Sequence, residues 1–189
     1  LTLLVLSCDK FYDTWEPLEY SLSKYWNTKK IPINLLTNHK LPNYKNINVV
    51  NVGDDLTWSQ NLINCLKNVS QDYVLLWLDD VFLTSKVDID RIIEDFNWVV
   101  KNEISYLRLR RADQKKAKSN YSKLSSDSTY RTSIFCSIWK KDVLESLLEP
   151  EENPWQFELR GSRRSIAFEN FYQVNEDRVR YLHAIEKGK

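Results

Sequence analysis

The chain has 189 residues and a formal net charge of +1, from 27 Lys and Arg against 26 Asp and Glu. A charge this close to zero argues against a general affinity for nucleic acid or for an anionic membrane, so we expect no nucleic-acid partner. Hydrophobic residues make up 42% of the chain, which is enough for a core and excludes wholesale disorder. The length suits one domain.

Cysteines and histidines are too few to predict a metal or disulfide site by themselves. The three cysteines form no C-x-x-C pair and lie among apolar neighbours, so we interpret them as core residues in a reducing compartment. No apolar run reaches the roughly 20 residues of a membrane span, and LTLLVLS (1–7) lacks the basic leader of a signal peptide. We therefore expect a cytoplasmic protein without a transmembrane segment, and leave peripheral contact at the inner face of the membrane open. The chain starts without Met and stops at KGK, as a trimmed piece of a longer protein would.

Strands and helices alternate through the first 110 residues. Amphipathic spacing predicts helices over 14–26, 57–69 and 88–102, and the second of these begins with the capping-box pattern Thr57-x-x-Gln60. Apolar or alternating runs between the helices predict strands at 1–7, 31–38, 47–52, 73–78 and 106–110. This order is typical of an α/β domain with a mainly parallel sheet.

The pattern is less regular after residue 110. The polar stretch 112–130 has no periodicity and predicts a mobile loop. Strands are expected at 132–139 and 178–185, with a helix at 141–149 and partial helix over 155–172. With three glycines, no G-x-G-x-x-G and no Walker loop, the sequence disfavours a Rossmann dinucleotide site and a P-loop NTPase.

Two adjacent carboxylates, Asp79 and Asp80, end the apolar run of DYVLLWLDDVF. Ligands of open α/β sheets bind beyond the carboxyl ends of the strands. Crowded carboxylates repel each other unless a cation or hydrogen-bond donors offset the charge, and a hard divalent cation there would also hold a pyrophosphate. The alternative is a polar strand end, in which one Asp caps a turn and the other is solvated.

The ordered set LLVLSCDKFYD, LLTN, TWSQNL and DYVLLWLDDVFL resembles the GT-A fold of nucleotide-sugar-dependent glycosyltransferases. The segment ENPWQFE, after SIFCSIWKKDVLESLL, is similar to bacterial polysaccharide or lipopolysaccharide-type transferases. The resemblance covers about residues 1–160. It implies one three-layer α/β/α domain over 1–189. It also implies transfer of a sugar from a nucleotide-diphosphate sugar donor to a saccharide or lipid-linked acceptor, in bacterial surface-glycan biosynthesis and with Mn²⁺ or Mg²⁺.

Six residues are assigned to the donor by this resemblance. The loop Ser7, Cys8, Asp9 and Lys10 would lie by the base and ribose, with the Asp9 carboxylate accepting a hydrogen bond. Trp58 and Ser59 would lie near the donor, although a core anchor explains Trp58 equally well.

The same resemblance assigns the metal to Asp79 and Asp80, which would hold it against the diphosphate and so stabilise the leaving nucleoside diphosphate. The sequence departs from a plain D-x-D motif because Leu78 precedes an adjacent pair. It therefore stays open which Asp contacts the metal and which contacts the ribose.

An inverting transfer also requires a general base for the acceptor hydroxyl. Related enzymes place an acidic residue on the acceptor side, and Glu158 is the first candidate because Trp155 and Phe157 flank it. An aromatic neighbour can stack on a sugar face and raise the proton affinity of a carboxylate. The alternative without a catalytic role is that the aromatic residues belong to the core and the glutamates are solvated. Further candidate bases are Glu151, Glu152 and Glu169.

Arginines gather in two places. YLRLRRAD puts Arg108 and Arg110 on one face of a predicted strand, and RGSRRS places Arg160 and Arg164 one helical turn apart. Guanidinium groups match phosphate or an anionic sugar, but surface ion pairing with the many acidic residues is the more common role of such arginines.

Three alternatives to a glycosyltransferase remain. A nucleotidyltransferase also pairs carboxylates with a metal, but it usually has a glycine-rich phosphate loop, which SCDKFYD lacks. A non-catalytic nucleotide- or sugar-binding module of the same fold would need no general base. A structural α/β domain would use the two aspartates only to end a strand.

Overall fold

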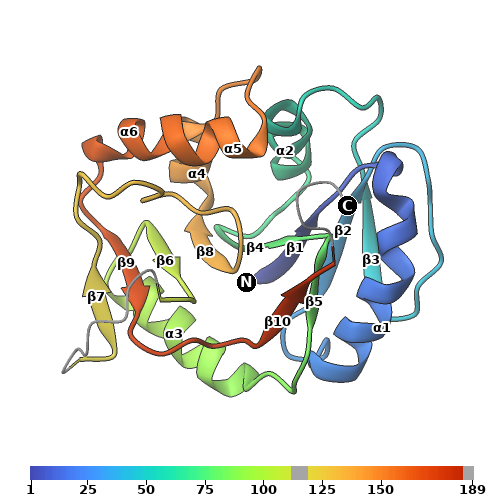
Figure 1. Cartoon of the computed structure of the whole chain (residues 1–189), viewed down its shortest axis with the longest axis horizontal. Helices are drawn as coiled ribbons and strands as arrows, with labels where there is room; N and C mark the ends of the chain where they lie inside the picture. Colours follow the sequence, from blue (N-terminus) through green and yellow to red (C-terminus); the bar gives the residue numbers. More distant parts are fainter. Residues whose placement is uncertain (112–118, 185–189) are drawn as a thin grey trace.

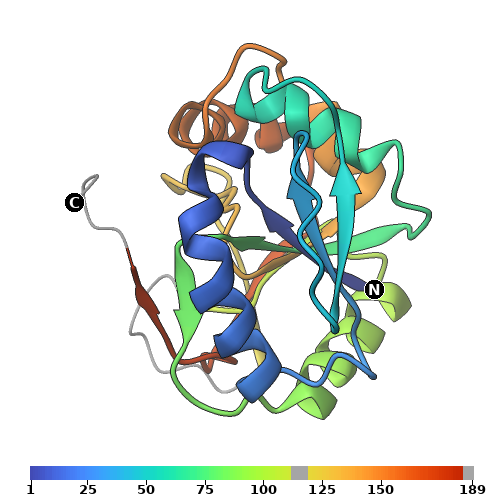
Figure 2. The same ribbon diagram turned by 90° about the vertical axis from the view of Figure 1, so that its right-hand side faces the viewer.

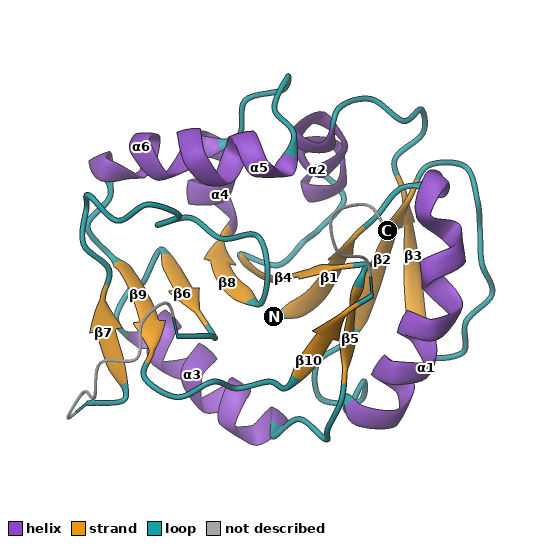
Figure 3. Cartoon of the chain, in the orientation of Figure 1, coloured by secondary structure: helices purple, strands orange, loops and turns teal. Residues whose placement is uncertain are grey.

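The computed structural model describes residues 1–111 and 119–184. In this part of the chain the main element is an eight-stranded sheet of order β3-β2-β1-β4-β8-β6-β9-β7 (Figures 1 and 3). Its strands are β1 (Thr2–Leu6), β2 (Ile33–Thr37), β3 (Ile47–Asn51), β4 (Tyr73–Leu78), β6 (Tyr106–Arg108), β7 (Tyr121–Lys123), β8 (Ser137–Lys140) and β9 (Phe171–Val174). Only β8 and β7 run against the others, so the sheet is mainly parallel, as predicted.

Helices cover both faces of the sheet. One layer contains α1 (Trp15–Tyr25) and α3 (Ile89–Lys101); the other contains α2 (Trp58–Leu66) and α4 (Lys141–Leu147) (Figures 1 and 2). A run of short turns continues the second layer: α5 (Pro154–Gln156), the π-helical η2 (Phe157–Gly161), α6 (Ser162–Arg164) and the 3-10 turn η3 (Ser165–Ala167). Another 3-10 turn, η1 (Asp9–Thr14), leads into α1. The three-layer α/β/α arrangement is confirmed.

Strand β4 shows why the sequence 73–78 is apolar without a break. Leu75 and Trp77 pack into the core under α1 and α3, while Val74 and Leu76 pack into the core under α2 and α4. All four side chains are fully buried. Because both faces are covered, the strand needs no polar alternation, and its first polar side chains come where the sheet ends, at Asp79 and Asp80.

The second half of the chain departs from the prediction. Of the strand expected over 132–139, only the end forms β8, because residues 132–136 run irregularly and Cys136 has a φ of 51°. The expected last strand forms β10 (Tyr181–His183), which pairs with the short β5 (Val81–Leu83) outside the main sheet. The polar stretch 119–130 contains the edge strand β7, which the sequence did not predict. Residues 112–118 lie outside the described residues, so the mobility expected there stays a prediction.

A buried ion pair fixes the segment that leads to β10. The Asp95 carboxylate on α3 is fully buried and accepts hydrogen bonds from the Arg178 guanidinium at 2.6 and 3.1 Å. The Tyr121 hydroxyl on β7 donates to the same carboxylate at 2.8 Å. This network joins a helix, an edge strand and the C-terminal segment, and Trp98 on α3 also stacks on Tyr121 with 3.8 Å between ring centroids.

Within residues 1–111 and 119–184, none of the helices combines the length and the apolar character that crossing a membrane requires.

Candidate active site

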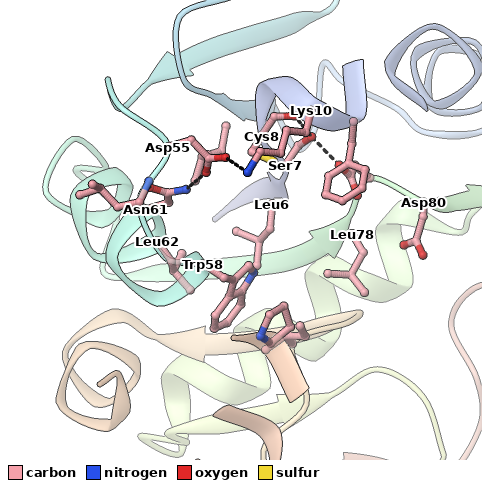
Figure 4. A pocket seen from close by; sticks show the side chains of 16 residues that line it. Leu6, Ser7, Cys8, Lys10, Asp55, Trp58, Asn61, Leu62, Leu78 and Asp80 are labelled. Atoms are coloured by element: carbon pink, nitrogen blue, oxygen red, sulfur yellow. Dashed lines mark hydrogen bonds and ion pairs between the residues drawn. The ribbon is translucent and has the colours of Figure 1, made fainter. Parts of the chain in front are cut away.

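A pocket of about 620 Å³ opens at the carboxyl ends of β1, β2 and β4, beside the first turn of α2 (Figure 4). This is the edge of the sheet at which α/β proteins bind ligands. Much of the lining is apolar. Its polar side chains are Ser7, Cys8, Lys10, Asp55, Asn61, Asp79 and Asp80.

Asp79 is held by a short chain of hydrogen bonds. Its Oδ2 accepts from the Ser7 hydroxyl at 2.5 Å, and the Trp15 indole N–H donates to the same hydroxyl at 2.6 Å. Burial, helped by the adjacent charge of Asp80, raises the pKa of Asp79 to about 6, although the hydrogen bond from Ser7 acts in the opposite direction. Folding therefore costs this carboxylate part of its hydration, and a bound cation would offset that cost.

Asp80 lies beside it on the pocket wall, and its backbone carbonyl accepts from the Ala184 N–H at 2.7 Å. Neither carboxylate forms an ion pair with a residue that the structure describes. No group of three or more His, Cys, Asp or Glu side chains in the same part of the chain could hold a metal ion. Two hard oxygen donors without a cationic partner fit a divalent ion whose other ligands are phosphate oxygens and water.

The opposite side of the pocket holds a polar cluster of which the sequence analysis predicted only Lys10. Asp55 forms an ion pair with Lys10 at 3.0 Å and accepts a hydrogen bond from the Asn61 side-chain amide at 2.9 Å (Figure 4). The Asn61 side-chain oxygen accepts from the Leu56 N–H at 3.1 Å, which fixes its orientation. The run GDDLTW contains a second pair of adjacent aspartates after a predicted strand, and that was the available signal.

The first turn of α2 places Trp58 and Ser59 on different sides. Thr57 caps the helix, since its hydroxyl accepts from the Gln60 N–H at 3.1 Å. Trp58 both lines the pocket and packs on Phe157 with 5.6 Å between ring centroids, so both of its proposed roles are compatible with its position. Ser59 is fully buried outside the pocket lining, and its hydroxyl has no hydrogen-bond partner among the described residues.

Asp9 does not line the pocket. Its carboxylate accepts hydrogen bonds from the backbone N–H groups of residues 38, 39 and 40 at 2.9 to 3.0 Å. Burial opposes its ionisation, but these three donors together hold the pKa of Asp9 below its usual range. Asp9 thus ties the loop after β1 to the loop after β2, and its contact with a nucleotide stays a prediction.

Glu158 and Trp155 lie beside the pocket and not in its lining. Glu158 Oε1 accepts from the Ile134 N–H at 3.1 Å, and the same Ile134 lines the pocket. Burial raises the pKa of Glu158, although the Ile134 N–H, Ser133 and two arginines act against this shift. Trp155 is 61% exposed, and its indole N–H donates to the Tyr130 hydroxyl at 3.3 Å.

Neither the protein-family models nor the curated proteins give a match to the sequence. Among solved structures, residues 1–349 of S. aureus TarS in complex with UDP match with a TM-score of 0.64 at 12% identity, over 96% of this chain and 60% of that one. The mannosyltransferase PcManGT from Pyrobaculum calidifontis, in complex with GDP-Man and Mn²⁺, matches with a TM-score of 0.62 at 12% identity, over 98% and 57%. A cytidylyltransferase from Leptospira borgpetersenii matches with a TM-score of 0.54 at 14% identity, over 94% and 76%.

These similarities show the fold alone, because the identities are low. The chain has a GT-A-like glycosyltransferase fold, and it spans about three fifths of the length of the two glycosyltransferase chains. The cytidylyltransferase match shows that a related sheet also occurs in a different class of enzyme.

Proposed function

We propose that the protein is a metal-assisted glycosyltransferase that moves a sugar from a nucleotide-diphosphate sugar to a saccharide or lipid-linked acceptor, with residues 1–189 as one transferase domain. One observation carries the proposal: a buried carboxylate and its neighbour, Asp79 and Asp80, line a pocket of about 620 Å³ at the carboxyl edge of a GT-A-like sheet. Related folds solved with UDP and with GDP-Man and Mn²⁺ support the choice of donor.

The nucleoside would bind at the Lys10, Asp55 and Asn61 end of the pocket. Amide and carboxylate groups held in fixed orientations can hydrogen-bond a base or a ribose. Trp58 lies between this end and the pair of aspartates in the view of Figure 4, where its indole would pack against the donor.

Asp79 and Asp80 would hold Mn²⁺ or Mg²⁺ at the other end. When bound, such an ion would neutralise charge that develops on the leaving nucleoside diphosphate. Ser7 and Trp15 would keep the Asp79 carboxylate aimed into the pocket through the hydrogen-bond chain described above.

Glu158 would act as the general base on the acceptor side and take a proton from the acceptor hydroxyl at Oε2, because Oε1 already accepts from the Ile134 N–H. A carboxylate whose pKa is raised by burial is a stronger base than a solvated one. The exposed ring of Trp155 offers a surface for a sugar face.

The role in bacterial surface-glycan biosynthesis rests on the resemblance of ENPWQFE and its surroundings alone. The cytidylyltransferase match keeps nucleotidyl transfer as a second candidate function. A binding module without catalysis is the alternative that a test must separate from both.

The test is calorimetric titration of UDP in the presence of Mn²⁺, Mg²⁺ or EDTA, followed by a thermal-stability screen of nucleotide sugars. We expect UDP binding that depends on the cation, and an increase in melting temperature with one class of nucleotide sugar, because a ligand that binds only the folded state raises stability.

Asp80→Asn should remove the cation dependence. Asp72→Asn, an exposed carboxyl at the other end of β4, should not. Binding of CTP in preference to UDP would favour nucleotidyl transfer, and sugar binding that is indifferent to the cation would favour the module. Absence of all binding would overturn the proposal.

A further inference from the structure

Arg108 and Arg110, which the sequence placed on one strand face, differ from the other arginines near the site. Arg160 and Arg164 both pair with the buried Glu152, so ion pairing explains these two arginines of the RGSRRS cluster. Among the described residues, neither Arg108 nor Arg110 forms an ion pair with a carboxylate. Both half-buried guanidinium groups act electrostatically on Glu158, but neither forms a direct ion pair with it, so their hydrogen-bond donors are not used by that carboxylate.

Arg110 is held by aromatic rings. Its guanidinium carbon lies 5.1 Å from the ring centroid of Phe135 and 4.5 Å from that of Tyr181. Contacts of this kind hold a guanidinium through its flat faces and leave the N–H groups in its plane available. The Arg110 side chain donates no hydrogen bond to a residue within 1–111 or 119–184.

Arg108 contacts Tyr130, which forms an exposed aromatic surface together with Trp155. Its Nε donates to the Tyr106 hydroxyl at 3.2 Å and its Nη2 donates to the Tyr130 carbonyl, so several of its five donors remain. Tyr130 has a φ of 56°, and it receives the Trp155 hydrogen bond noted above. Backbone strain of this kind at a non-glycine residue is often found at ligand sites. The Tyr130 and Trp155 rings are 40% and 61% exposed.

These groups flank the donor pocket and stay outside it. No arginine lines the pocket, and its one lysine is already paired with Asp55. Glu158 and Ile134 form the boundary between the donor pocket and these groups, because the Glu158 carboxylate accepts a hydrogen bond from the backbone N–H of Ile134, which lines the pocket. Arg108 and Arg110 both act electrostatically on Glu158, so an anion bound by them would lie near this residue, which we assign to the acceptor side.

We propose that Arg108 and Arg110 bind a phosphate or carboxylate group of the acceptor, so that the enzyme glycosylates a negatively charged saccharide, whose ring packs on Tyr130 and Trp155. This inference rests on the proposed function, since it names the acceptor class for the same site. Planar guanidinium groups match the geometry of both anions, and an aromatic face binds the apolar face of a sugar.

The test compares three sugars of similar size by NMR titration, with and without UDP and Mn²⁺: methyl glucoside, glucose 6-phosphate and glucuronic acid. Inorganic phosphate is the fourth probe. We expect at least one anionic sugar to bind about tenfold or more tightly than methyl glucoside, the size of effect that a hydrogen bond to a charged group produces. Inorganic phosphate alone should bind more weakly than that sugar, because it cannot use the aromatic surface.

Arg110→Gln should reduce the affinity for the preferred anionic sugar to the affinity for methyl glucoside. Arg110→Lys, which keeps the charge and the bulk, should give an intermediate affinity. Arg91→Gln on α3 removes the same charge from a residue that pairs with Glu94 and lies 4.0 Å from Asp95, and it should leave the affinity for each sugar unchanged. UDP affinity should be equal in all four proteins.

Three results would overturn the inference. One is wild-type protein that does not discriminate between anionic and neutral sugars. Another is an unchanged preference in both Arg110 variants. The third is loss of UDP affinity in those variants, which would assign the arginines to the donor diphosphate. Failure of wild-type protein to bind UDP at all would instead contradict the proposed function, while the sugar titrations without UDP would still test the anion site.

Discussion

The two halves of the sheet differ in construction and in charge. Strands β3, β2, β1 and β4 are all parallel, and their carboxyl ends present Asp79 and Asp80 to the pocket. Strands β8, β6, β9 and β7 are of mixed direction, and Arg108, Arg110 and exposed aromatic rings lie on their side. One half thus carries a negative site suited to a cation and the other a positive site suited to an anion.

The two halves share one source of stability and differ in another. Both contain apolar strands buried on both faces, such as β4 in the parallel half and β8 in the mixed half. The mixed half also contains the buried Asp95–Arg178 pair, which joins segments far apart in the chain. A buried charge pair is specific in geometry and costly to disrupt, whereas apolar strands tolerate change better. The variants below test this difference and the division of function.

The largest effect is expected from Asp80→Ala in the parallel half. Turnover should fall by about 10³-fold or more, since a metal site that neutralises leaving-group charge contributes several kcal/mol. The measurement is release of UDP from the nucleotide sugar that the stability screen selects. Melting temperature should stay close to that of wild type, and Asp72→Ala is the matched control at the exposed end of the same strand. Full activity of Asp80→Ala would contradict the assigned role.

Arg178→Met should have the largest effect on stability. It removes the cation that is hydrogen-bonded to the fully buried Asp95 carboxylate and leaves Arg91 at 4.0 Å, and breaking a buried pair costs about 3–5 kcal/mol. Urea unfolding at pH 7 measures the change. The double variant Asp95→Leu with Arg178→Met removes both charges and should recover most of the loss. A single-variant loss below about 1 kcal/mol would show that the pair is not what holds this half together.

Glu158→Gln should lower kcat by about 10²–10³-fold, the contribution typical of a general base. UDP affinity should be unchanged, because Glu158 lies outside the donor pocket. Since burial raises the pKa of Glu158, the wild-type rate should fall on the acid side from a pH above the usual range of a glutamate. The exposed Glu151 supplies the control, and a larger loss in Glu151→Gln would move the base to that residue.

The smallest of these effects is a pH-dependent stabilisation by Asp79→Asn. The folded pKa of about 6 lies above the ordinary value of 3.8, so the contribution of Asp79 to wild-type stability falls as pH rises from about 4 to 6 and is then level. Asparagine has no such loss, and without added metal the variant should gain at most about 3 kcal/mol over wild type above pH 6.

The difference between the Asp79→Asn and wild-type stability curves, obtained from urea unfolding at pH 4 and pH 7.5, isolates this residue. A stability difference that does not change with pH would show that the pKa of Asp79 is not raised in the folded protein. Saturating Mn²⁺ should shrink the difference at pH 7.5, because it binds the ionised carboxylate of wild type only.

Sequence reasoning was most successful where local pattern and burial agree. The run before Asp79 predicted a doubly covered strand, and that strand is β4. Sequence reasoning failed where the strands that pair are far apart in the chain. Strand β7 forms because Phe171–Val174 lies beside it, and β10 lies outside the main sheet because it pairs with Val81–Leu83. Neither partner can be identified from local propensity.

The same limit applies to the site. Ser7, Lys10, Trp58, Asp79 and Asp80 line the pocket, and each follows a predicted strand or begins a predicted helix. Asp55 was missed because the sequence does not say which carboxylate after a strand turns inward. Asp9 and Ser59 were also assigned to the donor; neither lines the pocket, since Asp9 accepts backbone hydrogen bonds and Ser59 is fully buried, so their contact with a donor stays a prediction.

The amino-acid sequence by itself determined the mainly parallel α/β architecture and the position of the paired carboxylates at its edge, because a 2-residue or 3.6-residue period and the end of an apolar run are local properties. Only the tertiary structure decided which charges meet. Arg110 packs against Phe135 and Tyr181, and the Glu158 carboxylate accepts a hydrogen bond from the Ile134 N–H, through contacts between segments far apart in the chain. Such contacts depend on long-range packing, which no short stretch of sequence encodes.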